Sequence, residues 1–156
     1  MKIREATEQD IPAMLRLMRE FAEFEELGQY FEATEDRLRE AIFGEDAVAE
    51  ALVAVEEDVF AGYAIFFTYF ASFRAQKGYY LEDLYVEPAF RGRGVGEALI
   101  RAIAAKGASR GFERIDFQVL EWNAAAIRFY EKLGAQRDDT ERHFKFTDEA
   151  FERLAK

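Results

Sequence analysis

The sequence of 156 residues contains no cysteine, one histidine and two prolines. The absence of cysteine excludes disulfides, thiolate metal sites and a cysteine nucleophile. A single histidine argues against a multi-histidine metal centre, so no metal is expected. Any chemistry must therefore come from carboxylates, tyrosines, amines and backbone groups.

Long apolar runs are also missing. The longest uncharged stretch, Val59–Phe73, is shorter than the roughly 20 residues that a membrane-spanning helix needs, and we interpret it as a buried strand. The N-terminus is charged from Lys2 onward and has no signal-peptide core. Together with the absence of cysteine, these features predict a cytoplasmic location and no membrane partner.

Apolar residues make up 50% of the chain and charged residues 33%, with 10 glycines. This composition excludes a disordered or low-complexity chain. The length suits one domain that can bury a substantial core, and no linker or internal repeat interrupts it. We therefore expect a single domain over residues 1–156.

The formal net charge of −10 is unevenly distributed. Residues 1–60 hold 17 acids and 6 bases, whereas residues 61–156 hold 14 acids and 15 bases. The acidic half argues against a nucleic-acid partner and favours a small cation, although acidic surfaces also simply keep proteins soluble. The segment from Pro88 to Phe112 contains five basic residues and one acidic residue, which indicates one anion-binding site.

Hydrophobic periodicity and turn residues predict an α/β fold with a mixed sheet. Thr7 and Asp10 resemble a capping box before the first helix, and Asn123 is a good N-cap for a later one. Strands are expected at about 2–6, 47–55, 59–70, 79–87, 112–120 and 143–146. Helices are expected up to about 26, after Thr34 to Gly44, from 98 to Gly111, from Asn123 to Gly134, and from Asp148.

A glycine-rich run, Arg91-Gly-Arg-Gly-Val-Gly96, lies between a strand and a helix. Glycines let the backbone approach a ligand, and a helix start favours an anion. The run lacks the Lys-Ser/Thr pair of a P-loop, and its glycine spacing and late position differ from those of the dinucleotide-binding motif. It is therefore a different kind of anion site.

This run resembles the acetyl-CoA pyrophosphate loop, Arg/Gln-x-x-Gly-x-Gly/Ala, of the GNAT N-acetyltransferase superfamily. The downstream run NAAAIRFYEKLG, residues 123–134, resembles the superfamily helix that reaches the cofactor. Residues 80–86, 121–123 and 20–25 are similar to the spermidine/spermine (diamine) and thialysine N-acetyltransferase branch. Two departures concern the acceptor pocket: Phe24 replaces a Tyr, and the 134–142 connection is short and lacks a Trp expected near it.

The resemblance implies a GNAT-like acyl-CoA N-acyltransferase fold, with a central, mostly antiparallel sheet flanked by helices, and a homodimer. It implies acetyl-CoA as cosubstrate. Backbone N–H groups of the loop would hold the pyrophosphate with the charges of two arginines, and the preceding strand and a later helix start would contact the pantetheine arm. The residues concerned are Leu84, Tyr85, Val86, Arg91, Gly92, Arg93, Gly94, Val95, Gly96, Glu97, Asn123 and Ala126.

Acetyl transfer needs an amine with an available lone pair, so a base must remove its proton. Glu82, on the strand just before the loop and expected to be half-buried there, is the candidate base; alternatively it is a Glu satisfied on a polar face. The resemblance assigns protonation of the thiolate leaving group to Tyr130, which could instead be an aromatic core residue.

Acceptor recognition is expected to use Phe24, Glu25, Glu82, Asp83, Asp116 and Gln118. Asp83 lies on the opposite side of an ideal strand from Glu82, and a bulge could bring both into one site. His143 is expected to be a structural residue, and Trp122 is expected to be a core or dimer aromatic rather than a ligand contact.

The predicted function is transfer of acetyl from acetyl-CoA to a primary amine of a small cationic acceptor, such as a polyamine, thialysine or another lysine-like amine. The alternatives are a protein lysine or N-terminal acetyltransferase, a non-catalytic acyl-CoA-binding regulator and, least favoured, a nucleic-acid module.

Overall fold

The computed structural model describes residues 1–156, which divide into two compact units, Met1–Gln118 and Val119–Lys156. We describe the units separately. The strands are β1 (Lys2–Glu5), β2 (Glu50–Glu56), β3 (Val59–Ala71), β4 (Gln76–Val86) and β5 (Arg114–Phe117). The helices are α1 (Ile11–Phe24), α2 (Glu35–Phe43), α3 (Val95–Ser109), α4 (Ala124–Lys132) and α5 (Asp148–Leu154).

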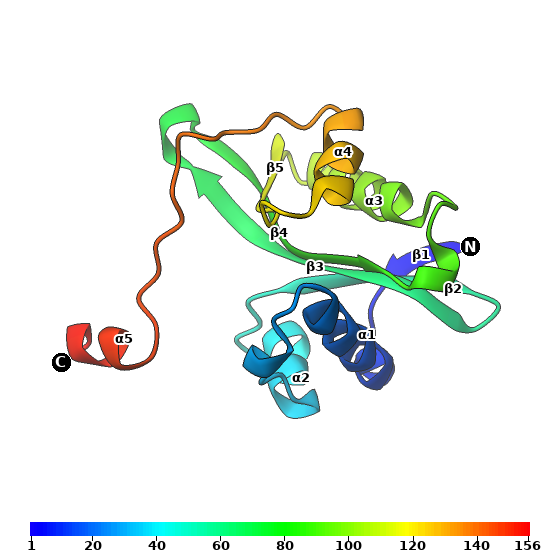
Figure 1. The fold of residues 1–156 in the computed structure, drawn as a ribbon, viewed down its shortest axis with the longest axis horizontal. Coiled ribbons are helices and arrows are strands. Elements are labelled where there is room, and N and C mark those ends of the chain that lie inside the picture. Colours follow the sequence, from blue (N-terminus) through cyan, green and yellow to red (C-terminus); the bar gives the residue numbers. More distant parts are fainter. The chain divides into compact units, whose positions relative to one another are not determined.

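The first unit is built on one five-stranded sheet in the order β1-β2-β3-β4-β5. Its first four strands pair antiparallel, and β5 pairs parallel with β4. Helices α1 and α2 cover one face of this sheet and α3 covers the other (Figure 1). This architecture confirms the predicted mixed sheet flanked by helices.

Alternation along β2 and β3 divides the apolar residues between two cores. Leu52, Ala64 and Phe66 pack with Leu99 and Ile103 of α3. On the opposite face, residues one position away in the sequence pack against α1 and α2. This second core contains Ile11, Met14, Leu17, Leu38, Ala51, Val53, Tyr63, Ile65 and Tyr85. The face shared with α1 and α2 is the one that carries the candidate site.

The start of α1 is fixed to β1 by a buried carboxylate. Asp10 is 5% exposed and accepts the backbone N–H of Thr7 at 2.7 Å, which confirms the predicted capping box. Its two oxygens also pair with Arg4, at 2.6 and 2.9 Å. The hydrogen bonds from Arg4 hold the pKa of Asp10 below its usual range, against the effect of burial.

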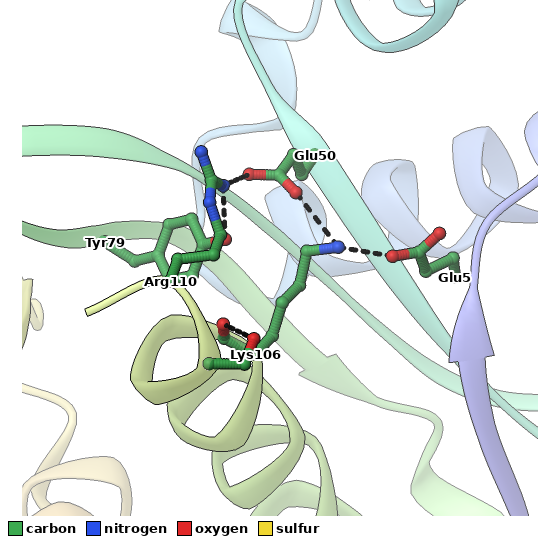
Figure 2. A network of polar contacts seen from close by, with 6 residues as sticks. Glu5, Glu50, Tyr79, Lys106 and Arg110 are labelled. Atoms are coloured by element: carbon green, nitrogen blue, oxygen red, sulfur yellow. Dashed lines mark hydrogen bonds and ion pairs between the residues drawn. The ribbon is translucent and has the colours of Figure 1, made fainter. Parts of the chain in front are cut away.

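A second polar network ties the end of α3 to the opposite edge of the sheet (Figure 2). Lys106 contacts Glu5 of β1 and lies 3.2 Å from Glu50 of β2. Arg110 joins the same Glu50 at 3.1 Å and donates to the hydroxyl of Tyr79 at 2.7 Å. A cavity of about 150 Å³ borders Glu5, Glu50 and Lys106, away from the glycine-rich loop.

The second unit contains α4 and α5. The side chain of Asn123 caps α4 by accepting the N–H of Ala126 at 3.2 Å, as predicted. The strand expected at 143–146 is wrong, because this segment pairs with no strand. Phe144 and Phe146 are 87% and 70% exposed. Alternation alone does not create a strand without a partner edge.

Strand β5 is also shorter than the expected 112–120. It pairs with Gly78–Leu81 of β4 and stops where β4 becomes irregular, as described below. No helix of the structure has the length and apolar character required to cross a bilayer.

Candidate active site

Strand β4 contains a bulge at Glu82. Along β3, Phe66 pairs with Leu81 and the preceding Ile65 pairs with Asp83, so Glu82 is the extra residue. Leu81 packs with the α3 core, whereas Tyr85 packs with the α1 and α2 core. Alternation from Tyr85 back to Asp83 therefore places Asp83 on the α1 and α2 face. A bulge at this position can bring Glu82 and Asp83 into one site.

Asp83 lies in a cluster of acidic and phenolic groups. The buried hydroxyl of Tyr63 donates to Asp83 Oδ2 at 3.0 Å. Burial raises the pKa of Asp83 to about 6, and the nearby Glu82 charge adds to this, although the Tyr63 hydrogen bond acts in the opposite direction. Burial and then the Asp83 charge also raise the pKa of Glu25, at the end of α1. Glu25 and Asp83 thus form a half-buried acidic cluster, and the buried Tyr63 is hydrogen-bonded to Asp83.

Glu82 does not have the environment that the sequence suggested. It was expected to be half-buried, but its side chain is exposed and Asp83 is the half-buried carboxylate. The extra residue of a bulge is left out of the ladder, which accounts for the exposure. The two acids are nevertheless electrostatically coupled.

Beyond the bulge, β4 presents an edge that β5 does not cover. Leu84, Tyr85 and Val86 pair with β3 on one side, whereas β5 reaches only as far as Leu81 on the other. Backbone groups on such an edge can accept an added extended ligand. At its end, the Val86 carbonyl accepts a hydrogen bond from Arg91 Nε at 2.9 Å.

The glycine-rich loop leads directly into α3. Gly92 and Gly94 have φ angles of 74° and 80°, and a Cβ on either would meet open space, so the backbone conformation is what requires glycine. The first helical hydrogen bond is donated by Ala98 to Gly94. The backbone N–H groups of residues 92–97 therefore have no backbone acceptor. Six N–H groups without a backbone acceptor, at and just before the start of a 15-residue helix, are suited to binding an anion.

The two loop arginines are engaged with the protein. Arg93 pairs with Glu56 at 2.6 Å and lies over the Phe90 ring. Arg91 lies over Phe24 and Tyr85, with its guanidinium carbon 5.3 and 5.4 Å from the two ring centroids. Both guanidinium groups thus contact other parts of the protein, and their contribution of charge to a pyrophosphate stays a prediction.

On β5, Asp116 is already paired. Arg114 holds it through two hydrogen bonds of 2.7 and 2.8 Å, and the Tyr69 hydroxyl donates at 2.9 Å. The Arg114 hydrogen bonds lower the pKa of Asp116. Asp116 therefore orients Tyr69 rather than offering an unpaired charge to an acceptor. Gln118, also predicted for the acceptor, is exposed just after β5.

The remaining predicted residues belong to the second unit. The side chain of Asn123 accepts a hydrogen bond from the N–H of Ala126, so Asn123 stabilises the start of α4 as an N-cap. Tyr130 is half-buried on α4, with its ring centroid 5.0 Å from that of Phe129. Trp122 is 53% exposed, so a core position is wrong for it within this chain.

Sequence reasoning missed Tyr63. It lies inside the long uncharged run and reads as a core aromatic, which it also is. The signal that could have found it is the hairpin register: with the bulge included, Tyr63 is placed diagonally across from Asp83. The stacking of Arg91 on Phe24 was also missed, because it joins residues distant in the sequence.

Comparisons with known proteins identify the family of this chain. The profile of the "Acetyltransferase (GNAT) family" matches residues 11–135. The thialysine N-epsilon-acetyltransferase of Bos taurus is 38% identical over 98% of this chain and 96% of its own length. The L-ornithine N5-acetyltransferase NATA1 of Arabidopsis thaliana is 28% identical over 99% of this chain and 88% of its own.

Solved structures agree. A crystal structure of a Bacillus halodurans protein, in a form carrying four substitutions, has a TM-score of 0.79 and 28% identity, covering 93% of this chain and 99% of that one. The fold and the family match define an acyltransferase. The chain belongs to the GNAT family and is an N-acetyltransferase, an enzyme that transfers an acetyl group to an amine. Acetyl-CoA is the acetyl donor in this family.

Proposed function

We propose that this enzyme transfers acetyl from acetyl-CoA to a primary amine of a small cationic acceptor. One observation carries the proposal: a cradle of unpaired backbone N–H groups at residues 92–97 follows the strand that bears a half-buried acidic cluster. The cradle suits a diphosphate and the cluster suits an ammonium ion. Relatives that act on thialysine or ornithine support a lysine-like acceptor.

The residues present fit the cofactor. Backbone groups of residues 92–97 would hold its diphosphate, and the uncovered edge at Leu84–Val86 would pair with its pantetheine amides. When bound, acetyl-CoA would supply the thioester whose carbonyl carbon the amine attacks. Asn123 and Ala126 are proposed to contact the same arm from the start of α4.

The acceptor amine would be bound by Glu25 and Asp83, with Phe24 beside them. An alkyl ammonium with a pKa of about 10.4 is almost entirely charged at neutral pH, so carboxylates both attract it and must then release it as the neutral amine. Asp116 is a weaker candidate, because Arg114 already neutralises it. Gln118 stays a proposed acceptor contact.

We assign the base to the Glu82–Asp83 pair. A general base works best when its pKa lies near the operating pH, and the pKa of Asp83 is about 6. Asp83 is therefore better matched to proton removal than the sequence alone indicated, whereas the exposed Glu82 can pass the proton to water. The amine would then attack the acyl carbon, the C–S bond would break with its electron pair on sulfur, and the nitrogen would release its second proton to water.

Tyr130 is the proposed proton donor to the departing thiolate. A phenol stays protonated at neutral pH, so it can serve as an acid. Support comes from the family resemblance of residues 123–134 and from the position of Tyr130 within α4. The homodimer implied by the same resemblance is likewise a proposal.

The test is a free-thiol release assay with acetyl-CoA and a panel of spermidine, putrescine, thialysine, lysine and a lysine-containing peptide, with products identified by mass spectrometry. The proposal predicts acetylated small amines and equimolar CoA. Acetylation of the peptide alone would indicate that the enzyme is a protein acetyltransferase. No thiol release with any amine, despite CoA binding, would indicate a non-catalytic acyl-CoA binder.

A further inference from the structure

The guanidinium of Arg91 lies on the acceptor side of the sheet. Its Nε–H is bonded to the Val86 carbonyl, and its guanidinium carbon lies over the rings of Phe24 and Tyr85. Tyr85 belongs to the α1 and α2 core together with Tyr63, and Tyr63 holds Asp83. A loop residue expected to serve the cofactor thus places its charge on the face that carries the acidic cluster.

This charge has no carboxylate partner within the protein. Its neighbour Arg93 is paired with Glu56 at 2.6 Å. Two acids that act on Tyr85, Glu20 and Glu87, lie 2.7 and 3.8 Å from Arg16, and Glu87 Oε2 has no hydrogen-bond partner. Arg91 is exposed, and besides its bond to Val86 and its ring contacts it interacts with the hydroxyl of Tyr85. It can therefore bind an anion.

The contacts that hold Arg91 leave terminal N–H groups of its guanidinium available to a carboxylate. The bond to Val86 uses only Nε–H, and the guanidinium carbon lies 5.3 and 5.4 Å from the centroids of the Phe24 and Tyr85 rings. Phe24 has no hydroxyl that could occupy those donors. The terminal N–H groups that do not face the Tyr85 hydroxyl remain for hydrogen bonds to a carboxylate, a partner that arginine favours.

The spacing suits a molecule with charges at both ends. Asp83 and Val86 are three positions apart on β4, or about 10 Å along an extended strand. The acidic cluster lies near one end of this distance and the Arg91 guanidinium near the other. A side-chain amine and an α-carboxylate separated by several carbon atoms, as in lysine-like amino acids, match this order of charges. A diamine carries a second cation where Arg91 is positive.

We propose that Arg91 is a specificity-determining residue that binds the carboxylate of an amino-acid acceptor while the acidic cluster binds its side-chain amine. The inference rests on the proposed function. It predicts that the enzyme prefers amino acids to the corresponding decarboxylated diamines, and that Arg91 supplies the preference.

The experiment compares matched acceptors on the wild-type protein and on Arg91→Gln. Glutamine is an alternative residue at this position of the loop pattern, so the variant keeps the cofactor loop. The readout is the ratio of kcat/KM for lysine to that for 1,5-diaminopentane, and the same ratio for thialysine and its decarboxylated form. A hydrogen-bonded charge pair contributes enough that we expect each ratio to fall about 10- to 100-fold in Arg91→Gln.

Arg101→Gln is the matched control, because Arg101 is 73% exposed on α3 and pairs only with Glu97. It removes the same charge, and both ratios should stay at the wild-type value. Calorimetry with CoA should give similar affinities for all three proteins. A proportional loss with amino acids and diamines would assign Arg91 a structural or cofactor role and overturn the proposal. A wild-type enzyme that acetylates diamines as well as amino acids would also overturn it, and would leave the proposed function intact.

Discussion

Asp83 shows how neighbours decide the chemistry of one residue. On β4 it follows the bulged Glu82, lies beside Glu25 and accepts a hydrogen bond from Tyr63. Burial raises its pKa to about 6 even though the Tyr63 hydrogen bond favours the charged form. The enzyme thus holds a carboxylate whose proton affinity is closer to neutral pH than that of an exposed acid.

Replacing Asp83 by Asn should lower the catalytic rate while changing stability in a different, pH-dependent way. We expect kcat to fall by about 10²- to 10⁴-fold, and the acidic limb near pH 6 to disappear from the kcat/KM profile. Because the native pKa exceeds the unfolded value, wild-type stability falls as pH rises through about 4 to 6. The variant lacks this loss, so its urea midpoint relative to wild type should be higher at pH 8 than at pH 4. A kcat equal to that of wild type, or an acidic limb that stays in place, would contradict the role given to Asp83.

Tyr130 is tested by removing one oxygen atom. Tyr130→Phe keeps the ring that contacts Phe129, so circular dichroism and thermal unfolding should match those of the wild type. If the phenol protonates the thiolate, kcat falls by about 10²- to 10⁴-fold. The matched control is Tyr30→Phe, because Tyr30 is 71% exposed and has no assigned role. Unchanged turnover in Tyr130→Phe would remove this residue from the mechanism.

At the scale of elements, the turn before α3 depends on left-handed glycines. Gly94→Ala should cost about 1 kcal/mol of stability, because its φ is 80°. Relaxation of this strain would turn the N–H groups away, so we expect CoA to bind about fivefold more weakly or worse. Gly111→Ala is the control: its φ is 76° and its Cβ would also meet open space. It should lose similar stability with no change in CoA affinity by calorimetry. Equal affinity losses in both variants would argue against the cradle.

The junction between β1 and α1 depends on one buried carboxylate. Asp10→Asn should lower the free energy of unfolding by about 2 kcal/mol at pH 7, because Arg4 loses its partner while it is partly buried. The pKa of Asp10 is lowered in the folded protein, so this contribution is present above the unfolded pKa and disappears as the pH falls through the folded value. Urea titrations at pH 7 and pH 3 measure it, with the exposed Asp36→Asn as control. A difference from wild type that is as large at pH 3 as at pH 7 would contradict this account.

Sequence patterns predicted the elements where the signal is local. The capping box at Thr7, the cap at Asn123 and the glycine-rich turn are set by neighbouring residues, and all three are present. The predicted strand at 143–146 failed because a strand depends on an edge elsewhere in the chain. The length of β5 failed for the same reason, since it ends where β4 bulges.

At the scale of the whole molecule, the chain brings the acids Glu25 and Asp83 together on the α1 and α2 face of the sheet and places backbone N–H groups without backbone acceptors at the start of α3. Net charge and motif order predicted that both would exist. They did not predict the exposure of Glu82, the contribution of Tyr63 or the position of Arg91. Those features depend on a register shift of one residue and on contacts between distant segments.

The central claim is that backbone donors at residues 92–97 bind the diphosphate of CoA. Titration of CoA into the purified protein by calorimetry tests it most directly. The account predicts saturable heat at submillimolar CoA, weakened in Gly94→Ala and preserved in Gly111→Ala. Absence of heat at millimolar CoA would contradict it.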